Sequence, residues 1–129
     1  MSESEHHKQG IINDEILCVK QLQIVEKYER FANYIYPVLQ NMRRTHGVLR
    51  DQVLKSVFLQ IELLNRAGKS GQIARLYEAD ANLSNLRFYI RFLADPKRKL
   101  ISQKQSTVSS VHLAEVGKML GAWIRSKKR

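Results

Sequence analysis

The residue types best suited to chemistry occur together in the run RRTHG, where His46 lies two positions after Arg44. An imidazole can accept and return a proton and a guanidinium can hold a phosphate, a combination that is able to cleave RNA. The same run fits the end of a helix that contacts phosphate, because Gly47 interrupts the apolar pattern there. We favour helix termination with phosphate contact, and we keep a ribonuclease based on His46 and Arg44 as a further hypothesis.

Other catalytic and metal-binding sets are incomplete. Cys18 has no evident partner base and lies near the expected start of a helix, so we interpret it as a core or boundary residue. His6 and His7 are adjacent imidazoles without further ligands, and His112 falls at the edge of an apolar helical face. A di-metal bundle site needs Glu-x-x-His pairs on facing helices, a set that the chain does not supply. The sequence therefore predicts no catalytic residues, no metal site and no cofactor.

The run AGKS around Lys69 is similar to the tail of a phosphate-binding loop. It lacks the first glycine at the required spacing and the strand that precedes such a loop, so a nucleotide site is not expected. Backbone amides at a helix start can still hold one phosphate together with Lys69. A structural connection, with Ser70 capping the next helix, is the interpretation that we favour.

Two arginines interrupt the apolar run LRFYIRFL, in which Arg87 and Arg91 lie one helical turn apart. A helical wheel places both on one narrow polar line with Asp80. Two interpretations are open. In the first, the arginines pair with Asp80, Glu26 or Glu29, because a buried guanidinium needs partners. In the second, they meet phosphates or an acidic partner surface. The spacing by itself slightly favours the ion pairs.

Apart from that polar line, apolar side chains cover most of the circumference of the same helix. A surface helix of a monomeric bundle needs an apolar arc only a little wider than about 100°. The remaining apolar surface must be covered by something else, and another copy of the chain is the simplest cover. The sequence therefore predicts a homo-oligomer.

The charge balance indicates a polyanionic partner. Lys and Arg number 22 against 12 Asp and Glu, which gives a net charge of +10. Residues 19–129 carry 21 basic and 8 acidic side chains, a net of +13, and nine basic residues follow Pro96 with a single acid. Such an excess raises the local concentration of polyanions and speeds their capture. RNA or DNA is therefore an expected partner.

Apolar residues recur at helical spacing in four segments, whereas no segment alternates with the period of two that a half-buried strand needs. The segments are marked by Ile24, Tyr28, Phe31, Ile35, Val38 and Met42; by Val53, Val57, Ile61 and Leu64; by a helix from about Gln72 to Ala94; and by Leu113, Val116, Leu120, Trp123 and Ile124. Pro37 is expected to bend the first helix without ending it. Four helices with mostly short connections predict an all-α, antiparallel up-down-up-down four-helix bundle.

The chain is expected to divide into a disordered leader over residues 1–12, one bundle domain over residues 13–126 and a basic tail over residues 127–129. Asn13 or Asp14 is the expected N-cap of the first helix. The single cysteine cannot form an intrachain disulfide, and no apolar run is long enough to span a membrane. A cytoplasmic protein without a membrane partner is therefore expected.

Several strings occur in an order and at spacings that resemble the accessory variability determinant (Avd) proteins of diversity-generating retroelements. They are IVEKYERF, YIYP, THGVLR, AGKSGQ, RLYEAD, NLRFYIRFLA and AEVGKMLGAWI, and they cover residues 22–95 and 113–125. Residues 1–21 and the linker over residues 96–110 lie outside the resemblance. The resemblance implies a four-helix bundle without catalytic activity that assembles into a ring-like homopentamer.

The resemblance also implies two kinds of partner: the reverse transcriptase of the element, and its template RNA and DNA during mutagenic cDNA synthesis and retrohoming. Arg87 and Arg91 match the arginines of the family's LRF-x-x-RFL segment, so they are expected to bind nucleic acid or the reverse transcriptase. Five further basic residues are assigned to the same role on charge alone: Arg75, Lys69, Arg43, Arg44 and Arg50.

A more distant resemblance is to the bundle proteins that are encoded by intervening sequences of bacterial 23S ribosomal RNA genes. That alternative keeps the fold and the association with RNA, but it removes the polymerase partner. The strings AGKSGQ and RLYEAD favour the retroelement protein over the ribosomal one.

Overall fold

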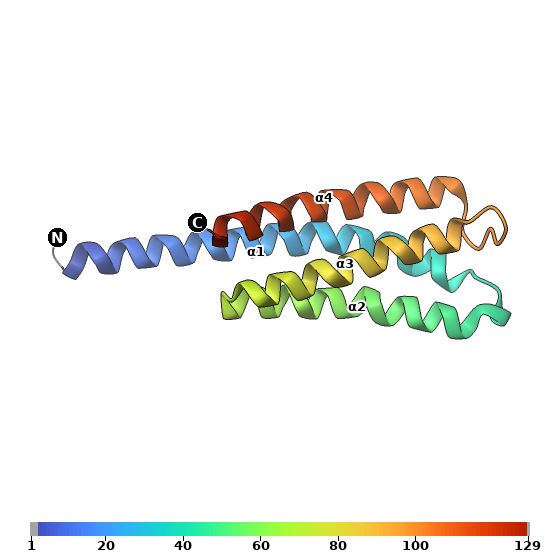
Figure 1. The fold of residues 1–129 in the computed structure, drawn as a ribbon, viewed down its shortest axis with the longest axis horizontal. Coiled ribbons are helices and arrows are strands. Elements are labelled where there is room, and N and C mark those ends of the chain that lie inside the picture. Colours follow the sequence, from blue (N-terminus) through green and yellow to red (C-terminus); the bar gives the residue numbers. More distant parts are fainter. Residues whose placement is uncertain (1–2, 129) are drawn as a thin grey trace.

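The protein is a bundle of four α-helices that lie side by side, and Figure 1 shows their arrangement. The computed structural model describes residues 3–128, with side chains described for residues 21–128. The helices are α1 (Glu3–Gln40), α2 (Gly47–Ser70), α3 (Ile73–Ala94) and α4 (Gln103–Lys128), and a short 3₁₀ helix, η1 (Arg44–His46), joins α1 to α2. Each helix packs against its neighbours in the chain, and α4 closes the bundle by packing against α1. The predicted all-α four-helix bundle is confirmed.

The first helix begins earlier than its sequence pattern suggested. α1 starts at Glu3, ten residues before Asn13, and its N-terminal part continues beyond the end of the other three helices (Figure 1). Residues 3–12 contain no proline, and acidic side chains near the N-terminus favour a helix through its dipole. At the other end α1 continues past Pro37 to Gln40, as predicted.

The core contains large apolar side chains from all four helices, including Phe31, Leu64, Leu83 and Leu120, each with no exposed surface. The predicted stripe of α1 is correct except at Val38, which is half-buried, whereas Leu39 is fully buried. A step of 3.6 residues from Ile35 falls between positions 38 and 39, so the pattern could not choose between them.

The predicted stripe of α2 is correct at three of its four positions, because Val53, Val57 and Leu64 are buried. Ile61 is only half-buried and Phe58 is 54% exposed, whereas the polar side chains of Ser56 and Gln60 are buried. An apolar pattern cannot reveal the burial of Ser56 and Gln60, because both side chains are polar.

A buried network of hydrogen bonds compensates these polar groups. The Asn82 amide of α3 donates to the Ser56 carbonyl oxygen at 3.0 Å and to the Gln60 side-chain oxygen at 2.9 Å. The Ser56 hydroxyl donates to the Asn82 side-chain oxygen at 2.9 Å, and the Gln60 amide donates to the Ala79 carbonyl oxygen at 2.9 Å. The network fixes the register of α2 against α3, since each buried polar group must keep its partner.

A second polar contact links α1 to α2. The buried Tyr28 hydroxyl donates a hydrogen bond to the carbonyl oxygen of Val57. Burial raises the pKa of the Tyr28 phenol far above its ordinary value, so the hydroxyl keeps its proton. Tyr28 therefore acts as a neutral donor inside the bundle rather than as an acid or base.

The connections differ in build. Gly71 ends α2 in the left-handed conformation with φ 67°, and its N–H donates to the Ala67 carbonyl oxygen at 3.2 Å. The predicted capping of α3 by Ser70 is wrong: Ser70 is the last residue of α2, and Gln72 takes the N-cap position without a side-chain cap. The Ser70 hydroxyl instead accepts the N–H of Gln72 at 3.2 Å, within the turn between the two helices. α4 begins at Gln103, well inside the expected linker. A capping box starts it, in which the Ser102 hydroxyl accepts the Gln105 N–H at 3.0 Å and the Gln105 side chain accepts the Ser102 N–H at 2.9 Å.

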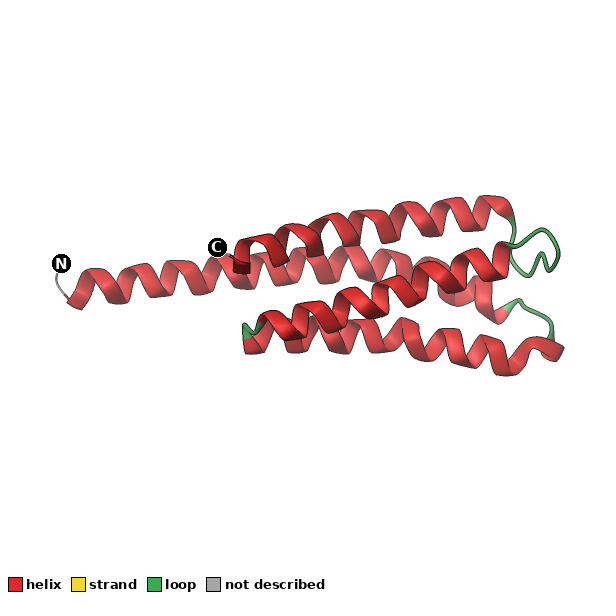
Figure 2. Cartoon of the chain, in the orientation of Figure 1, coloured by secondary structure: helices red, strands yellow, loops and turns green. Residues whose placement is uncertain are grey.

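The two connections that follow α1 and α3 lie at the same end of the bundle, and the α2–α3 turn lies at the other (Figure 2). We call the first end the loop end and the second the turn end. Within the described residues, no helix combines the length and the apolar character that a membrane span requires.

Candidate nucleic-acid interface

The seven basic residues selected from the sequence do not form one site. Arg43, Arg44 and Arg50 lie at the loop end, Lys69 and Arg75 lie at the turn end, and Arg87 and Arg91 lie along α3. The described part of the chain therefore offers three basic regions, each with its own geometry.

The loop end holds a hollow that we call the basic end pocket. Arg43 and His46 line it from the connection after α1, and Arg98 and Lys99 line it from the connection after α3. The other lining residues are Asn41, Met42 and Leu100, and no acidic residue is among the described residues of the lining. Three permanent cations and an imidazole, from segments more than fifty positions apart in the sequence, thus meet at one hollow.

Arg98 is held in place by contacts with Phe92 in the last turn of α3. Its guanidinium carbon lies 3.6 Å from the centroid of the Phe92 ring, and its Nε donates to the Phe92 carbonyl oxygen at 3.2 Å. A guanidinium has five N–H donors, so four remain after this bond. Arg98 and Lys99 were missed by the sequence analysis, which assigned no role to the run PKRKL in the linker.

Arg50 and Arg75, two of the arginines chosen on charge alone, have acidic neighbours. Arg50 lies 3.5 Å from Asp51, and Arg75 lies 3.3 Å from Glu78. Exposed pairs of this kind are worth little and are screened by salt, so both guanidiniums can exchange their carboxylate for a phosphate. Arg44 and Lys69 are exposed.

Basic residues at the end of α4 join Lys69 and Arg75 at the turn end. A Cβ atom built on Gly71 would lie 3.7 Å from Lys127 Nζ, so this lysine reaches the α2–α3 turn. Lys128 Nζ lies 5.8 Å from the centroid of the Tyr77 ring on α3. The residues expected to form a basic tail are thus helical through Lys128 and extend the basic surface of the turn end.

Arg87 crosses from α3 to α4. Its guanidinium occupies the space where a Cβ atom of Gly117 would stand, so the glycine allows the arginine to lie against the backbone of α4. Arg87 is half-buried and Arg91 is exposed. Within the described residues, neither arginine forms an ion pair, with Asp80, Glu26 or Glu29 or with any other acid. The structure therefore does not contain the ion pairs of the first interpretation.

The chain matches the model of a known protein family. The family model described as bAvd-like matches residues 22–127, a span that includes nearly all of the bundle described above. The chain belongs to the bAvd-like family. No curated protein matches the chain. Membership supports an accessory protein of a retroelement, in agreement with the resemblance found in the sequence.

The bAvd-like chain does not assemble a catalytic set around His46. The imidazole is half-buried at the end of η1, Arg44 is exposed, and no hydrogen bond within the described residues joins the His46 side chain to another side chain. The described residues also contain no cluster of three or more side chains suited to hold a metal ion. The structure does place His46 in the lining of the basic end pocket, which the sequence did not predict.

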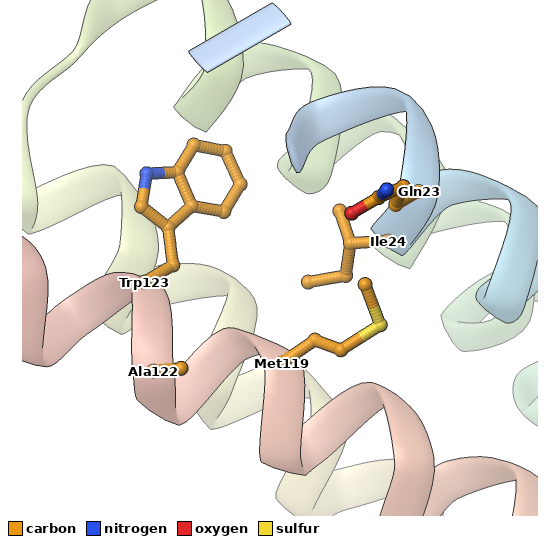
Figure 3. Close-up of a pocket in the computed structure, with 5 residues that line it drawn as sticks. All are labelled: Gln23, Ile24, Met119, Ala122 and Trp123. Atoms are coloured by element: carbon orange, nitrogen blue, oxygen red, sulfur yellow. The ribbon is translucent and has the colours of Figure 1, made fainter. Parts of the chain in front are cut away.

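A different hollow in the bAvd-like bundle is apolar. Figure 3 shows it between α1 and α4, with Ile24 and Met119 approaching each other and Trp123 beside them. Gln23 and Ala122 are the other described residues of the lining, and none of the five described side chains is ionisable. The Trp123 indole N–H is buried and has no hydrogen-bond partner among the described residues, but in Figure 3 it lies on the side of the ring away from Ile24.

Aromatic side chains beside the arginines of α3 are incompletely covered. Phe88 is 51% exposed, and its ring centroid lies 5.8 Å from those of Tyr89 and Phe92. On the α1–α2 face, the Tyr36 and Phe58 rings lie 6.3 Å apart and both are exposed. The single chain thus leaves apolar surface uncovered on α3, as the sequence pattern predicted.

Proposed function

We propose that this bAvd-like protein is a non-enzymatic accessory protein of a diversity-generating retroelement. In the cytoplasm it binds the reverse transcriptase of the element and its template RNA and DNA through basic surfaces, and it supports mutagenic cDNA synthesis and retrohoming. The active form is a homo-oligomer, a ring-like homopentamer, in which further copies of the chain cover exposed apolar surface such as the Tyr36–Phe58 pair.

The observation that carries the proposal is the surface of α3. Arg87 and Arg91 are without acidic partners among the described residues, and the exposed ring of Phe88 lies between them in the sequence. Unpaired guanidiniums bind phosphates, and an exposed ring stacks on a base, so this combination suits single-stranded nucleic acid or an acidic partner surface. Family membership favours the retroelement over the ribosomal alternative.

Binding of single-stranded RNA is expected to weaken steeply with salt. Neutralising three or four phosphates releases counterions, so log K should fall with log[salt] with a slope of about −2 to −3. Fluorescence anisotropy of a labelled oligonucleotide between low and moderate salt measures the slope. A flat response would show that the basic surfaces do not contact phosphates.

The reverse transcriptase encoded beside this chain is expected to co-purify with it. The test expresses both proteins together, with an affinity tag on the bAvd-like chain, and treats the lysate with nuclease so that nucleic acid cannot bridge them. Retention of the reverse transcriptase at moderate salt supports a direct protein complex. Its loss after nuclease treatment would contradict a direct contact and leave only association through nucleic acid.

A further inference from the structure

We propose that the basic end pocket binds a single terminal phosphate group, such as the 5′-phosphate of a nucleic-acid strand. The inference deepens the proposed function and rests on it for the natural source of the phosphate. It assigns a specific ligand chemistry to Arg43, His46, Arg98 and Lys99, which line a hollow at the loop end, whereas the general proposal rests on Arg87 and Arg91 within α3.

The donors of the pocket suit a phosphate dianion. Arg43, Arg98 and Lys99 supply three permanent positive charges, and His46 adds a donor on its ring. A terminal phosphate carries a charge of about −1.5 to −2 near pH 7 and presents three strongly accepting oxygens. An internal phosphodiester carries only one negative charge, so a pocket with three cations favours the terminal group over the middle of a strand.

The pocket is preorganised. Arg98 is fixed by the Phe92 ring and carbonyl group, and the Lys99 N–H donates to the Asp95 carbonyl oxygen at 2.8 Å. Lys99 has φ 50°, a left-handed conformation that is uncommon for a residue other than glycine. The Leu100 N–H donates to the Leu93 carbonyl oxygen at 2.9 Å, which ties the connection back to α3. The backbone of the connection and the Arg98 side chain are therefore already ordered before binding, which lowers the entropic cost of binding.

Neighbouring carboxylates do not neutralise the pocket. Asp95 accepts the backbone N–H of Lys97 at 2.8 Å, and Asp51 lies 3.5 Å from Arg50. Neither acid belongs to the lining. The charge of the pocket is thus available to an external anion.

Lys99→Asn is the sharpest variant, because asparagine tolerates the left-handed backbone while it removes the charge. The matched control is Lys97→Asn, which removes the same charge from the same connection but at an exposed residue outside the lining. Binding of two single-stranded oligonucleotides of identical sequence, one with a 5′-phosphate and one with a 5′-hydroxyl, is measured by anisotropy. In parallel, inorganic phosphate is added to each protein in increasing concentration. The melting temperature is compared with that in sodium chloride of equal ionic strength.

The wild-type protein and Lys97→Asn are expected to prefer the 5′-phosphate about tenfold, as charge-assisted hydrogen bonds allow, and Lys99→Asn should lose this preference. A second outcome is that inorganic phosphate stabilises the wild-type protein and Lys97→Asn but not Lys99→Asn, while no protein prefers either oligonucleotide. That outcome supports a phosphate site in the pocket whose ligand is the free ion. Absence of both effects in the wild-type protein overturns the inference, and so does an equal loss in the two variants. If the inference is overturned but both oligonucleotides bind with a steep salt dependence, the proposed function still stands. If neither oligonucleotide binds, the proposed function is contradicted as well.

Discussion

Replacing Asn82 with leucine is expected to lower the free energy of unfolding by about 2–4 kcal/mol. The leucine is similar in volume, but it removes the hydrogen bonds that Asn82 makes to Ser56 and Gln60. The Gln60 side-chain oxygen and the Ser56 hydroxyl would then be buried without partners, and each carries a desolvation penalty. Urea unfolding followed by circular dichroism gives the difference directly.

The control for this prediction removes the polar groups together. A triple variant, Ser56→Ala with Gln60→Leu and Asn82→Leu, leaves no unsatisfied side-chain group, so it should recover much of the lost stability. A single Asn82→Leu variant as stable as the wild type would contradict a role of the network in stability. A triple variant that is stable but loses a defined oligomer would show that the network also specifies how the helices align.

The helices were predictable because their stripes are long and periodic. The burial of Phe31, Leu83 and Leu120 follows from spacing alone, and the start of α3 and its end before Asp95-Pro96 follow from local backbone rules. The burial of Gln60 on α2 was not predictable, because this side chain is polar and its burial depends on Asn82, which is distant in the sequence. A pattern of apolar residues contains no information about which polar groups find buried partners.

The candidate site was predictable only in part. The charge excess and the family resemblance selected Arg43 and Arg87, but the meeting of Arg43 with Arg98 and Lys99 required the topology. In an up-down-up-down bundle the first and third connections share one end, so the fold already predicted that the basic runs near residues 43 and 98 would be neighbours. Which side chains of those runs line a common hollow depends on the conformation of the α3–α4 connection, including the left-handed backbone of Lys99.

Removing the two arginines of α3, with Arg87→Ala and Arg91→Ala in one chain, is expected to weaken binding of single-stranded RNA by about tenfold near physiological salt. The slope of log K against log[salt] should become shallower by about 1.4, since each lost phosphate contact on a single strand accounts for about 0.7. Stability should change by less than about 1 kcal/mol, because neither arginine has an acidic partner among the described residues.

A matched control separates this effect from the loss of charge in general. Arg30→Ala with Arg66→Ala removes two positive charges from exposed positions on α1 and α2. That variant should lose less affinity than the α3 variant, because these positions lie away from Phe88 and its neighbouring guanidiniums. Equal losses would show that only net charge matters. A fall in unfolding free energy of about 3–5 kcal/mol in the α3 variant would restore the structural interpretation of Arg87 and Arg91, since breaking a buried ion pair has that cost.

A third variant tests Arg87 without removing its charge. Gly117→Ala places a methyl group where the Arg87 guanidinium now lies, so the arginine must leave the surface of α4. The displaced group is the far end of a flexible side chain, and alanine is the better helix former by about 1 kcal/mol, so the bundle should stay folded. If RNA binding needs Arg87 held against α4, affinity falls although the net charge is unchanged. If the guanidinium needs only to be free, affinity stays the same, and the contact with Gly117 serves packing rather than recognition.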